Sequence, residues 1–331
     1  LGATFEGFCP MENHCVNPDL TMGENIADLG GLTMAFYAYK RTEEFKKQVE
    51  AEWHHLKNSP NTIDESELKR IAKFFTAMPY EKLNDQDDTY DEAIQNNKAF
   101  ASWAKRSVHL HKQKGYRAIT LSLKPHGLAP GDATSDQMRI VAELAEQYSF
   151  GELRVSHEQN LILADVKLQD IFKVWEKAKA HQLATPNIGL LTDIICCPGG
   201  DFCSLANAKS IPIATSIQEA FDNLDYLHDI GELELNISGC MNACGHHHIG
   251  HIGVLGVDKD GSEWYQVTIG GKQGNDASLG SVIGPSFAAE EMPGVVKKLI
   301  DVYIKHRNPE ERFIDTVRRL GVNPFKEHVY A

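Results

Sequence analysis

Five of the seven cysteines crowd into two short segments, and their spacing is the strongest chemical signal in the chain. Cys196, Cys197 and Cys203 stand in "ICCPGGDFCSLANA", and Cys240 and Cys244 stand in "SGCMNACGHHHIGH". Glycines beside them allow the backbone to approach a bulky inorganic group closely. No cysteine occurs between positions 16 and 195. This crowding favours a reduced chain that concentrates thiolates for a metal over a framework of disulfides.

Four thiolates suit either a tetrahedral zinc ion or a [4Fe–4S] cluster. Cys197 and Cys203 are separated by five residues, and Cys240 and Cys244 by three. Structural zinc sites usually contain closer C-x2-C pairs, because one ion needs its sulfurs close together. The wider spacings favour a cluster, whose irons lie apart from one another. Zinc and cysteines that bind nothing remain the alternatives.

Other cysteines and a run of histidines surround this motif. Cys196 is expected to be a buried free thiol, and Cys9 and Cys15 receive no role. A dense histidine cluster is able to bind zinc or copper, although the simpler interpretation is packing beside the cysteine segments. Its members are His246, His247, His248 and His251.

The composition limits the classes of partner. A formal charge of −13 argues against nucleic acid as a bulk partner, because phosphate binding needs a basic surface. No run of about 18 apolar residues predicts a membrane span, and no signal peptide is recognisable. We expect a cytoplasmic enzyme that acts on small molecules, with no membrane partner.

The elements that must position the cysteines follow from the hydrophobic pattern. Residues 43–112 are predicted to be a helical linker, with an acidic exposed connector at "YEKLNDQDDTYDEAIQ". Strands at 116–124 and 151–166 alternate with helices at 135–148 and 168–183, which is typical of a ferredoxin-like half with helices on one face of the sheet. Residues 181–331 are predicted to form a mixed α/β domain with a strand "ELELNIS", a hairpin turning at "DKDG" and a helix "AAEEMPGVVKKLIDVYIKHR".

The two cysteine segments resemble the cluster motif of the siroheme-containing nitrite and sulfite reductases. The residues that carry the resemblance are "CCPGGDFC" with "SGCMNACGHHHIGHIGVLG". The segment from "YRAITLSLK" to "NLILADV" is similar to the ferredoxin-like half-domain of the same family, here residues 113–180. The resemblance covers about residues 43–331 and is greatest to the assimilatory sulfite reductase hemoprotein type. It implies an α+β fold.

The resemblance also implies cofactors and their ligands. Cys197, Cys203, Cys240 and Cys244 would ligate a [4Fe–4S] cluster, and Cys244 would also bridge to the siroheme iron. Asn242 would fix the loop between the last two ligands or contact the cofactor. The implied activity is six-electron reduction of sulfite to sulfide, with nitrite reduction to ammonia as the alternative. The implied electron donor is a ferredoxin or an NADPH-linked flavoprotein.

Members of this family have two homologous halves, and the chain resembles only the second. The first half normally supplies the basic cage around the substrate, and Glu158 in "RVSHEQN" stands where that half has a cation. A half-subunit that works only with a separate partner chain is therefore a further hypothesis. Four cations are candidates for contacts to the siroheme carboxylates, although solvated surface is the simpler interpretation of each. They are Lys124, Arg117, Arg154 and Lys209.

Residues 1–42 resemble a different family. "LTMGENIADLGG" is similar to neprilysin-like zinc metallopeptidases, in which Glu24 would be a zinc ligand and Asp28 would orient a histidine. The chain has no H-E-x-x-H motif, because "HEQNL" ends in Leu161. One carboxylate cannot hold a catalytic zinc, so we expect a peptidase-like fragment without peptidase activity.

Overall fold

The computed structural model describes residues 42–57, 59, 63–75 and 77–331. The chain divides into two compact units, residues 1–78 and 79–331. In the described part of the first unit lie two helices, α3 (Thr42–Leu56) and α4 (Glu65–Ala72), where the charged periodic segments predicted them. Asp64 caps α4, because its carboxylate accepts the backbone N–H of Glu67 at 2.8 Å.

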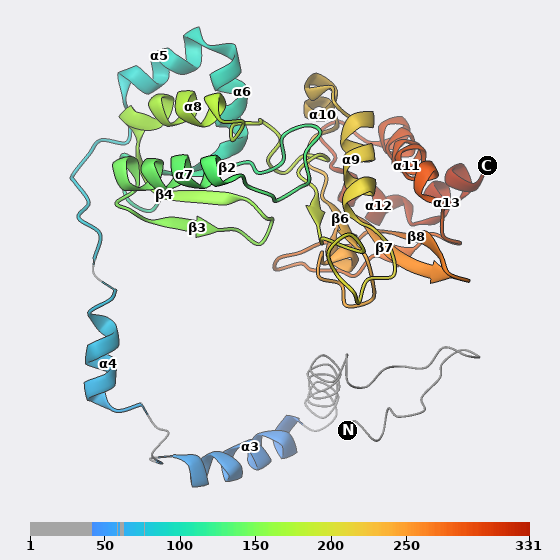
Figure 1. The fold of residues 1–331 in the computed structure, drawn as a ribbon, viewed down its shortest axis with the longest axis horizontal. Helices are drawn as coiled ribbons and strands as arrows, with labels where there is room; N and C mark the ends of the chain where they lie inside the picture. The colour runs from blue at the N-terminus through green and yellow to red at the C-terminus, as the bar shows by residue number, and fades with distance from the viewer. Residues whose placement is uncertain (1–41, 58, 60–62, 76) are drawn as a thin grey trace. The chain divides into compact units, whose positions relative to one another are not determined.

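The second unit contains two sheets, each with its own hydrophobic core. We call residues 79–184 the first lobe and residues 185–331 the second lobe (Figure 1). The elements of the first lobe are α5 (Asp88–Asn96), α6 (Lys98–Ser107), β1 (Val108–Leu110), β2 (Tyr116–Leu121), α7 (Ser135–Tyr148), β3 (Leu153–Val155), β4 (Leu161–Lys167), η1 (Leu168–Asp170) and α8 (Ile171–Ala180).

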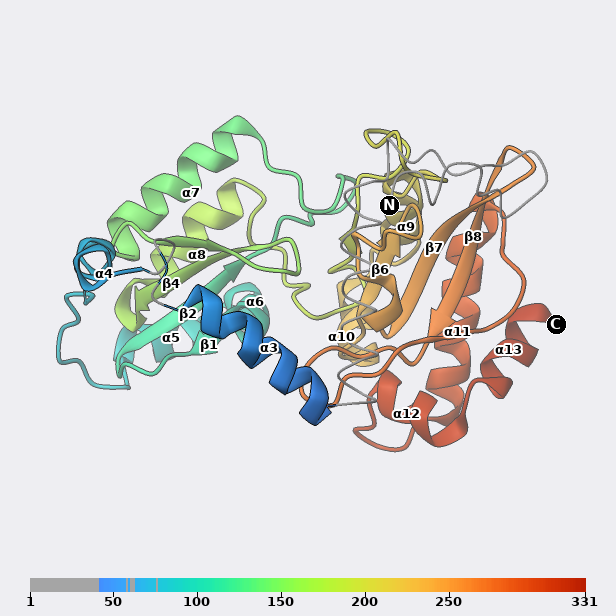
Figure 2. The same cartoon turned by 90° about the horizontal axis from the view of Figure 1, so that it is seen from below.

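The first lobe is an antiparallel sheet with strand order β1-β2-β4-β3. Ile119 pairs with Leu163, and both side chains are fully buried in a core shared with α6, α7 and α8. Helices cover this face of the sheet, as the strand and helix pattern predicted (Figure 2). The α+β fold expected from the sequence is confirmed.

Two local expectations for the first lobe need correction. The predicted strand at 151–166 is a hairpin, β3 and β4, because the chain turns at Ser156–Asn160, where Gln159 has a left-handed backbone with φ of 57°. The predicted helical linker at 43–112 contains α5, α6 and β1, which belong to this lobe. Phe100 and Trp103 of α6 are almost completely buried in its core, so the lobe begins well before residue 113.

The second lobe is a mixed sheet with strand order β5-β6-β7-β8-β9, packed against helices on one face (Figures 1 and 2). Strands β5, β6 and β7 run parallel, and the remaining pairs are antiparallel. Its elements are β5 (Ile195–Cys196), α9 (Ile211–Ala220), α10 (Leu224–Ile230), β6 (Leu235–Ser238), η2 (His247–Ile249), β7 (Ile252–Lys259), β8 (Ser262–Ile269), β9 (Ser281–Val282), η3 (Ala289–Glu291), α11 (Met292–His306), α12 (Phe313–Leu320) and α13 (Asn323–Tyr330).

Alternating side chains of the parallel strands form the core of the second lobe. Ile237 and Val254 are fully buried against α9 and α11. The predicted hairpin is confirmed, since Lys259 pairs with Ser262 across a two-residue turn. Both turn residues, Asp260 and Gly261, have positive φ (54° and 79°), which two-residue hairpin turns require.

Among the described residues, no helix has both the length and the apolar character that crossing a bilayer requires.

Candidate functional site

Two parallel strands bring the cysteine segments together. Strands β5 and β6 pair with Cys196 opposite Ile237, and the backbone N–H of Cys197 donates to the Ile237 carbonyl at 3.1 Å. The chain leaves both strands at the same edge, because the carboxyl ends of parallel strands coincide. Cys197 follows β5 directly and Cys240 follows β6 by two residues. The topology thus places two thiols from distant segments side by side.

Glycine permits the close approach of these two segments. A Cβ atom on Gly239 would lie 2.6 Å from the Ala208 carbonyl oxygen and 2.9 Å from the Gly199 Cα. A Cβ on Gly245 would lie 2.0 Å from the Ile237 carbonyl oxygen. No side chain fits at either position. The backbone N–H of Gly239 donates to the Cys197 Sγ at 3.0 Å, so the second cysteine segment contacts a thiol of the first segment.

Cys240 lies within electrostatic reach of the other three thiols predicted to be ligands. Burial raises the pKa of Cys240, the backbone N–H of Asn242 opposes that shift, and Cys197, Cys244 and Cys203 raise the pKa further. Cys197 and Cys240 are buried, Cys203 is half-buried and Cys244 is exposed. Over the described residues, no three His, Cys, Asp or Glu side chains close around a single metal ion. The four thiols are therefore neighbours, but they do not surround a position for a single metal ion.

The turn that presents Cys244 has an unusual backbone. Ala243 and His246 both have left-handed conformations, with φ of 56° and 52°. Such conformations are sparsely populated for residues other than glycine and gather at functional sites. Asn242 was expected to fix this loop through its side chain. That side chain is exposed and, among the described residues, has no hydrogen-bond partner, so its amide is available to a bound group.

Large apolar side chains stand exposed beside the thiols. Phe202 is 79% exposed and precedes Cys203, and Met241 is 84% exposed and follows Cys240. We call these four residues, together with Cys244, the thiol face. Large apolar side chains exposed next to candidate ligands are typical of a binding surface. Four thiols, a glycine-lined approach and exposed apolar side chains fit a bulky iron–sulfur group next to a large cofactor with an apolar face.

Cys196 and most of the nearby histidines are buried or packed against other protein groups. Cys196 is buried, and burial raises the pKa of its thiol. His247 and His251 are also buried, and burial lowers the pKa of each imidazole to about 4. His248 lies against His247 with ring centroids 4.6 Å apart, and His251 Nδ1 accepts the backbone N–H of Glu234 at 3.1 Å. His246 is exposed.

The cations considered for siroheme carboxylates each have a carboxylate partner within this chain. Lys124 is completely buried, so it is not on the surface at all. The nitrogen–oxygen pairs are Lys124–Asp193 at 2.5 Å, Arg117–Asp85 at 2.8 Å, Arg154–Glu152 at 3.0 Å and Lys209–Asp201 at 3.6 Å.

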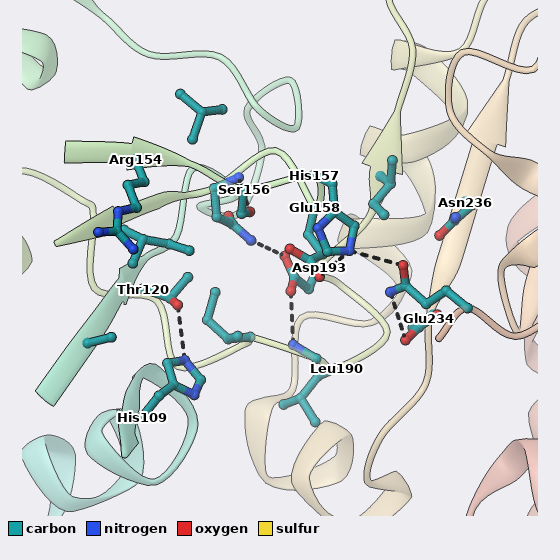
Figure 3. Close-up of a pocket in the computed structure, with 18 of the residues that line it drawn as sticks. His109, Thr120, Arg154, Ser156, His157, Glu158, Leu190, Asp193, Glu234 and Asn236 are labelled. Atoms are coloured by element: carbon teal, nitrogen blue, oxygen red, sulfur yellow. Dashed lines mark hydrogen bonds and ion pairs between the residues drawn. The ribbon is translucent and has the colours of Figure 1, made fainter. Parts of the chain in front are cut away.

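A cavity of about 610 Å³ lies between the uncovered face of the first sheet and the second lobe (Figure 3). Its polar groups include the carboxylates of Glu158, Asp193 and Glu234. Glu158 is paired with His157 at 2.8 Å, and burial raises the pKa of Glu234. The cavity does not include the predicted cluster ligands.

Sequence reasoning missed one residue that contacts the cysteine segment. The side-chain amide of Gln159 makes two hydrogen bonds to the backbone of Cys196, both at 2.8 Å. These residues lie 37 positions apart, so local periodicity gives no signal of the contact. Several predicted features fall outside the described residues, namely Cys9, Cys15, Glu24, Asp28 and the peptidase-like fragment 1–42.

Comparison with family models finds two matching domains in sequence order. Residues 190–331 match the model described as "Nitrite and sulphite reductase 4Fe-4S domain", and residues 109–181 match "Nitrite/Sulfite reductase ferredoxin-like half domain". Residues 1–63 match "Peptidase family M13", which extends past the expected boundary at residue 42.

Curated relatives support the two reductase-domain matches. The chain is 28% identical over 261 residues to an assimilatory ferredoxin-dependent nitrite reductase of Haloferax mediterranei, covering 76% of this chain and 43% of that protein. It is 28% identical to a ferredoxin–nitrite reductase of Synechococcus elongatus, covering 60% and 39%. It is 21% identical to an assimilatory-type sulfite reductase of Nitratidesulfovibrio vulgaris, covering 60% and 88%. The chain thus spans about two fifths of the two nitrite reductases.

Solved structures support the same fold. The Mycobacterium tuberculosis NirA protein is similar with a TM-score of 0.54 and 23% identity, over 66% of this chain and 41% of that one. Dissimilatory sulfite reductase I is similar with a TM-score of 0.54 and 13% identity, over 84% and 89%.

Proposed function

Because the chain belongs to the nitrite and sulfite reductase family, we propose that it takes part in the six-electron reduction of sulfite to sulfide. The cofactors of this family are a [4Fe–4S] cluster and siroheme. The cluster-domain match coincides with the second lobe. The observation that carries the proposal is the meeting of the two cysteine segments at the carboxyl ends of β5 and β6.

In this proposal, Cys197, Cys203, Cys240 and Cys244 hold the cluster. The Gly239 N–H aimed at the Cys197 Sγ favours a negatively charged sulfur there. When bound, the cluster and siroheme supply electrons one at a time to a single anion. The protein's part is to hold the thiolates in register, and β5 and β6 do so through backbone hydrogen bonds that do not involve the thiols.

We assign Cys244 as the ligand shared with the siroheme iron and Asn242 as a cofactor contact. Both residues are exposed, Cys244 as part of the thiol face and Asn242 two positions before it, so a large cofactor can reach them without unfolding the loop. Phe202 and Met241 would cover the apolar part of that cofactor and keep water away from it.

The basic groups that hold the anion are assigned to a separate partner chain. Anion reduction needs cations close to the reacting atoms, to offset charge and to donate protons. The four cations considered above already have carboxylate partners. A partner that supplies the first half would complete the site.

Nitrite is the second candidate substrate. The relatives from Haloferax mediterranei and Synechococcus elongatus are both named as ferredoxin-dependent nitrite reductases, which favours nitrite and a ferredoxin donor. Sulfite is favoured by the Nitratidesulfovibrio vulgaris protein, of which the chain covers 88%.

The cofactor assignment is tested by iron and acid-labile sulfide analysis. The full chain is expressed together with siroheme synthesis and purified without oxygen. We expect about five irons per chain, four from the cluster and one from the siroheme, about four acid-labile sulfides and a siroheme absorption spectrum. Cys197→Ser and Cys240→Ser should lose most of the iron, whereas the matched control Cys196→Ser should retain it. A colourless protein with one zinc would contradict the proposal.

The partner assignment is tested with reduced methyl viologen as the electron donor. Sulfite and nitrite consumption are measured in parallel, for the chain alone and for the chain mixed with the amino-terminal half of a family member. We expect activity only in the mixture. Full activity from the chain alone would show that no separate half is needed.

A further inference from the structure

The outer edge of β5 is closed by a side chain instead of a strand. β5 is the first strand of its sheet, and Cys197 directs its N–H toward β6. Successive backbone groups along a strand point in opposite directions, so the N–H and carbonyl of Cys196 point away from β6. Gln159 Nε2 donates to the Cys196 carbonyl, and Gln159 Oε1 accepts the Cys196 N–H, both at 2.8 Å. The amide thus substitutes for one residue of a neighbouring strand.

The first lobe holds Gln159 rigidly in this position. Its left-handed backbone, with φ of 57°, is fixed by donation from its N–H to the Ser156 carbonyl at 3.1 Å. A Cβ on Gly131 would lie 3.1 Å from the Gln159 Cβ, so the loop from the first sheet packs directly against this side chain. Next to it, Asn160 Nδ2 donates to Asp193 Oδ1 at 3.0 Å, which joins the same turn to the second lobe.

The Asp193 contact belongs to a buried polar network (Figure 3). Lys124 Nζ donates to Asp193 and to the Glu158 carbonyl, and it is completely buried. The network and the Gln159 amide therefore fix the segment from Asp193 to Cys196 at both ends. β5 itself contributes only two residues to its ladder.

We propose that Gln159 is a positioning residue, which fixes the Cys196 backbone from the first lobe and thereby fixes the Cys197 thiolate for the cluster. The second half of this statement rests on the proposed function. Without the amide, the Cys196 N–H and carbonyl would lose partners in a buried place, and such groups are rarely left unpaired. The segment would then move to find new partners, and the adjacent Cys197 would move with it.

The test compares Gln159→Met, Gln159→Glu and the control Gln273→Met in the full chain. Methionine retains the size of glutamine but removes both hydrogen bonds. Glutamate retains an acceptor for the Cys196 N–H and loses the donor. Gln273 also bonds across the cavity, to His157 and Glu234, but makes no contact with the cysteine segment. Urea midpoints show that each variant is folded.

The first measurement is hydrogen exchange at the Cys196 amide. We expect exchange at least about tenfold faster in Gln159→Met, a smaller change in Gln159→Glu and no change in Gln273→Met. Unchanged protection in Gln159→Met would overturn the proposal. This measurement needs no cofactor, so it gives an answer even if the proposed function is wrong.

The second measurement is cluster content and the electron paramagnetic resonance spectrum of the reduced cluster. We expect Gln159→Met to bind less iron and to show a shifted spectrum, with Gln159→Glu between it and the wild type. A wild-type chain without a cluster would refute the proposed function alone. A normal cluster spectrum in Gln159→Met would refute the positioning role of Gln159 alone.

Discussion

Replacing Lys124 with methionine should destabilise the chain severely. Lys124 is completely buried, and its ammonium group pairs with Asp193, whose side chain is 6% exposed. Methionine retains the apolar stem of lysine, so most packing contacts survive. The substitution leaves a buried carboxylate without its cation and the Glu158 carbonyl without its donor.

The expected magnitude follows from what remains around Asp193. Removal of one partner of a buried ion pair typically costs about 3–5 kcal/mol. Asp193 retains two donors, Asn160 Nδ2 at 3.0 Å and the Gly189 N–H at 2.9 Å, which places the cost near the lower end. We expect a loss of about 3 kcal/mol, or a fall in Tm of roughly 6–12 °C for a unit of this size.

Urea unfolding of the full chain, followed by tryptophan fluorescence, measures this loss. Trp103 and Trp175 are buried in the core of the first lobe and report its unfolding. The exposed pair of Lys209 with Asp201, at 3.6 Å, supplies the control. Lys209→Met should change the free energy of unfolding by less than about 0.5 kcal/mol.

A double variant separates charge from packing. Lys124→Met with Asp193→Asn removes both charges, so it should be more stable than Lys124→Met alone by about 2 kcal/mol. The reasoning would be refuted if Lys124→Met cost less than about 1 kcal/mol, or if the double variant were no more stable than the single one.

Three further predictions follow from burial and close contacts. Gly245→Ala would bring a Cβ to 2.0 Å from a backbone oxygen and should lower the free energy of unfolding by about 2 kcal/mol or more, whereas Gly294→Ala, with open space in α11, should raise it by about 0.5–1 kcal/mol. Equal urea midpoints would contradict this. Burial lowers the pKa of His251 to about 4, so the unfolded chain binds more protons between pH 4 and 6.5 and stability falls as pH drops through that window. The wild type should lose about 2 kcal/mol more than His251→Asn between pH 8 and pH 5, and an equal loss would count against this account. In the cofactor-free chain, iodoacetamide should modify exposed Cys244 before buried Cys196, whose pKa is raised by burial; mass spectrometry that finds the reverse order would disprove it.

The sequence predicts those parts of the fold that local chemistry determines. The β7–β8 hairpin follows from the turn at Asp260 and Gly261, and α7 and α11 follow from their apolar spacing. Helix α9 escaped notice because "IPIATSIQEA" is mostly apolar and lacks a clear polar face. Helices α12 and α13, of eight residues each, were also not predicted.

The candidate site also combines local features, which the sequence can predict, with long-range contacts, which it cannot. The choice of the four thiols as candidate ligands rests on cysteine spacing, which is a local property of the sequence. The partners of Lys124 and Gln159 were not, because Asp193 lies 69 positions from Lys124 and Cys196 lies 37 positions from Gln159. Such contacts depend on how the two lobes pack, and a single sequence without aligned relatives contains no signal of that packing.

The parallel pairing of β5 and β6 also bears on how the length of this chain can change. Between the two strands the chain passes through α9 and α10, and the connection between these helices is exposed at Asp222. The distance between Cys197 and Cys240 is determined by the backbone hydrogen bonds of the sheet, and not by the length of the connection between β5 and β6. Residues inserted after Asp222, even a small reporter domain, should leave the two thiols where they are. Insertions at this exposed connection are therefore compatible with an unchanged site.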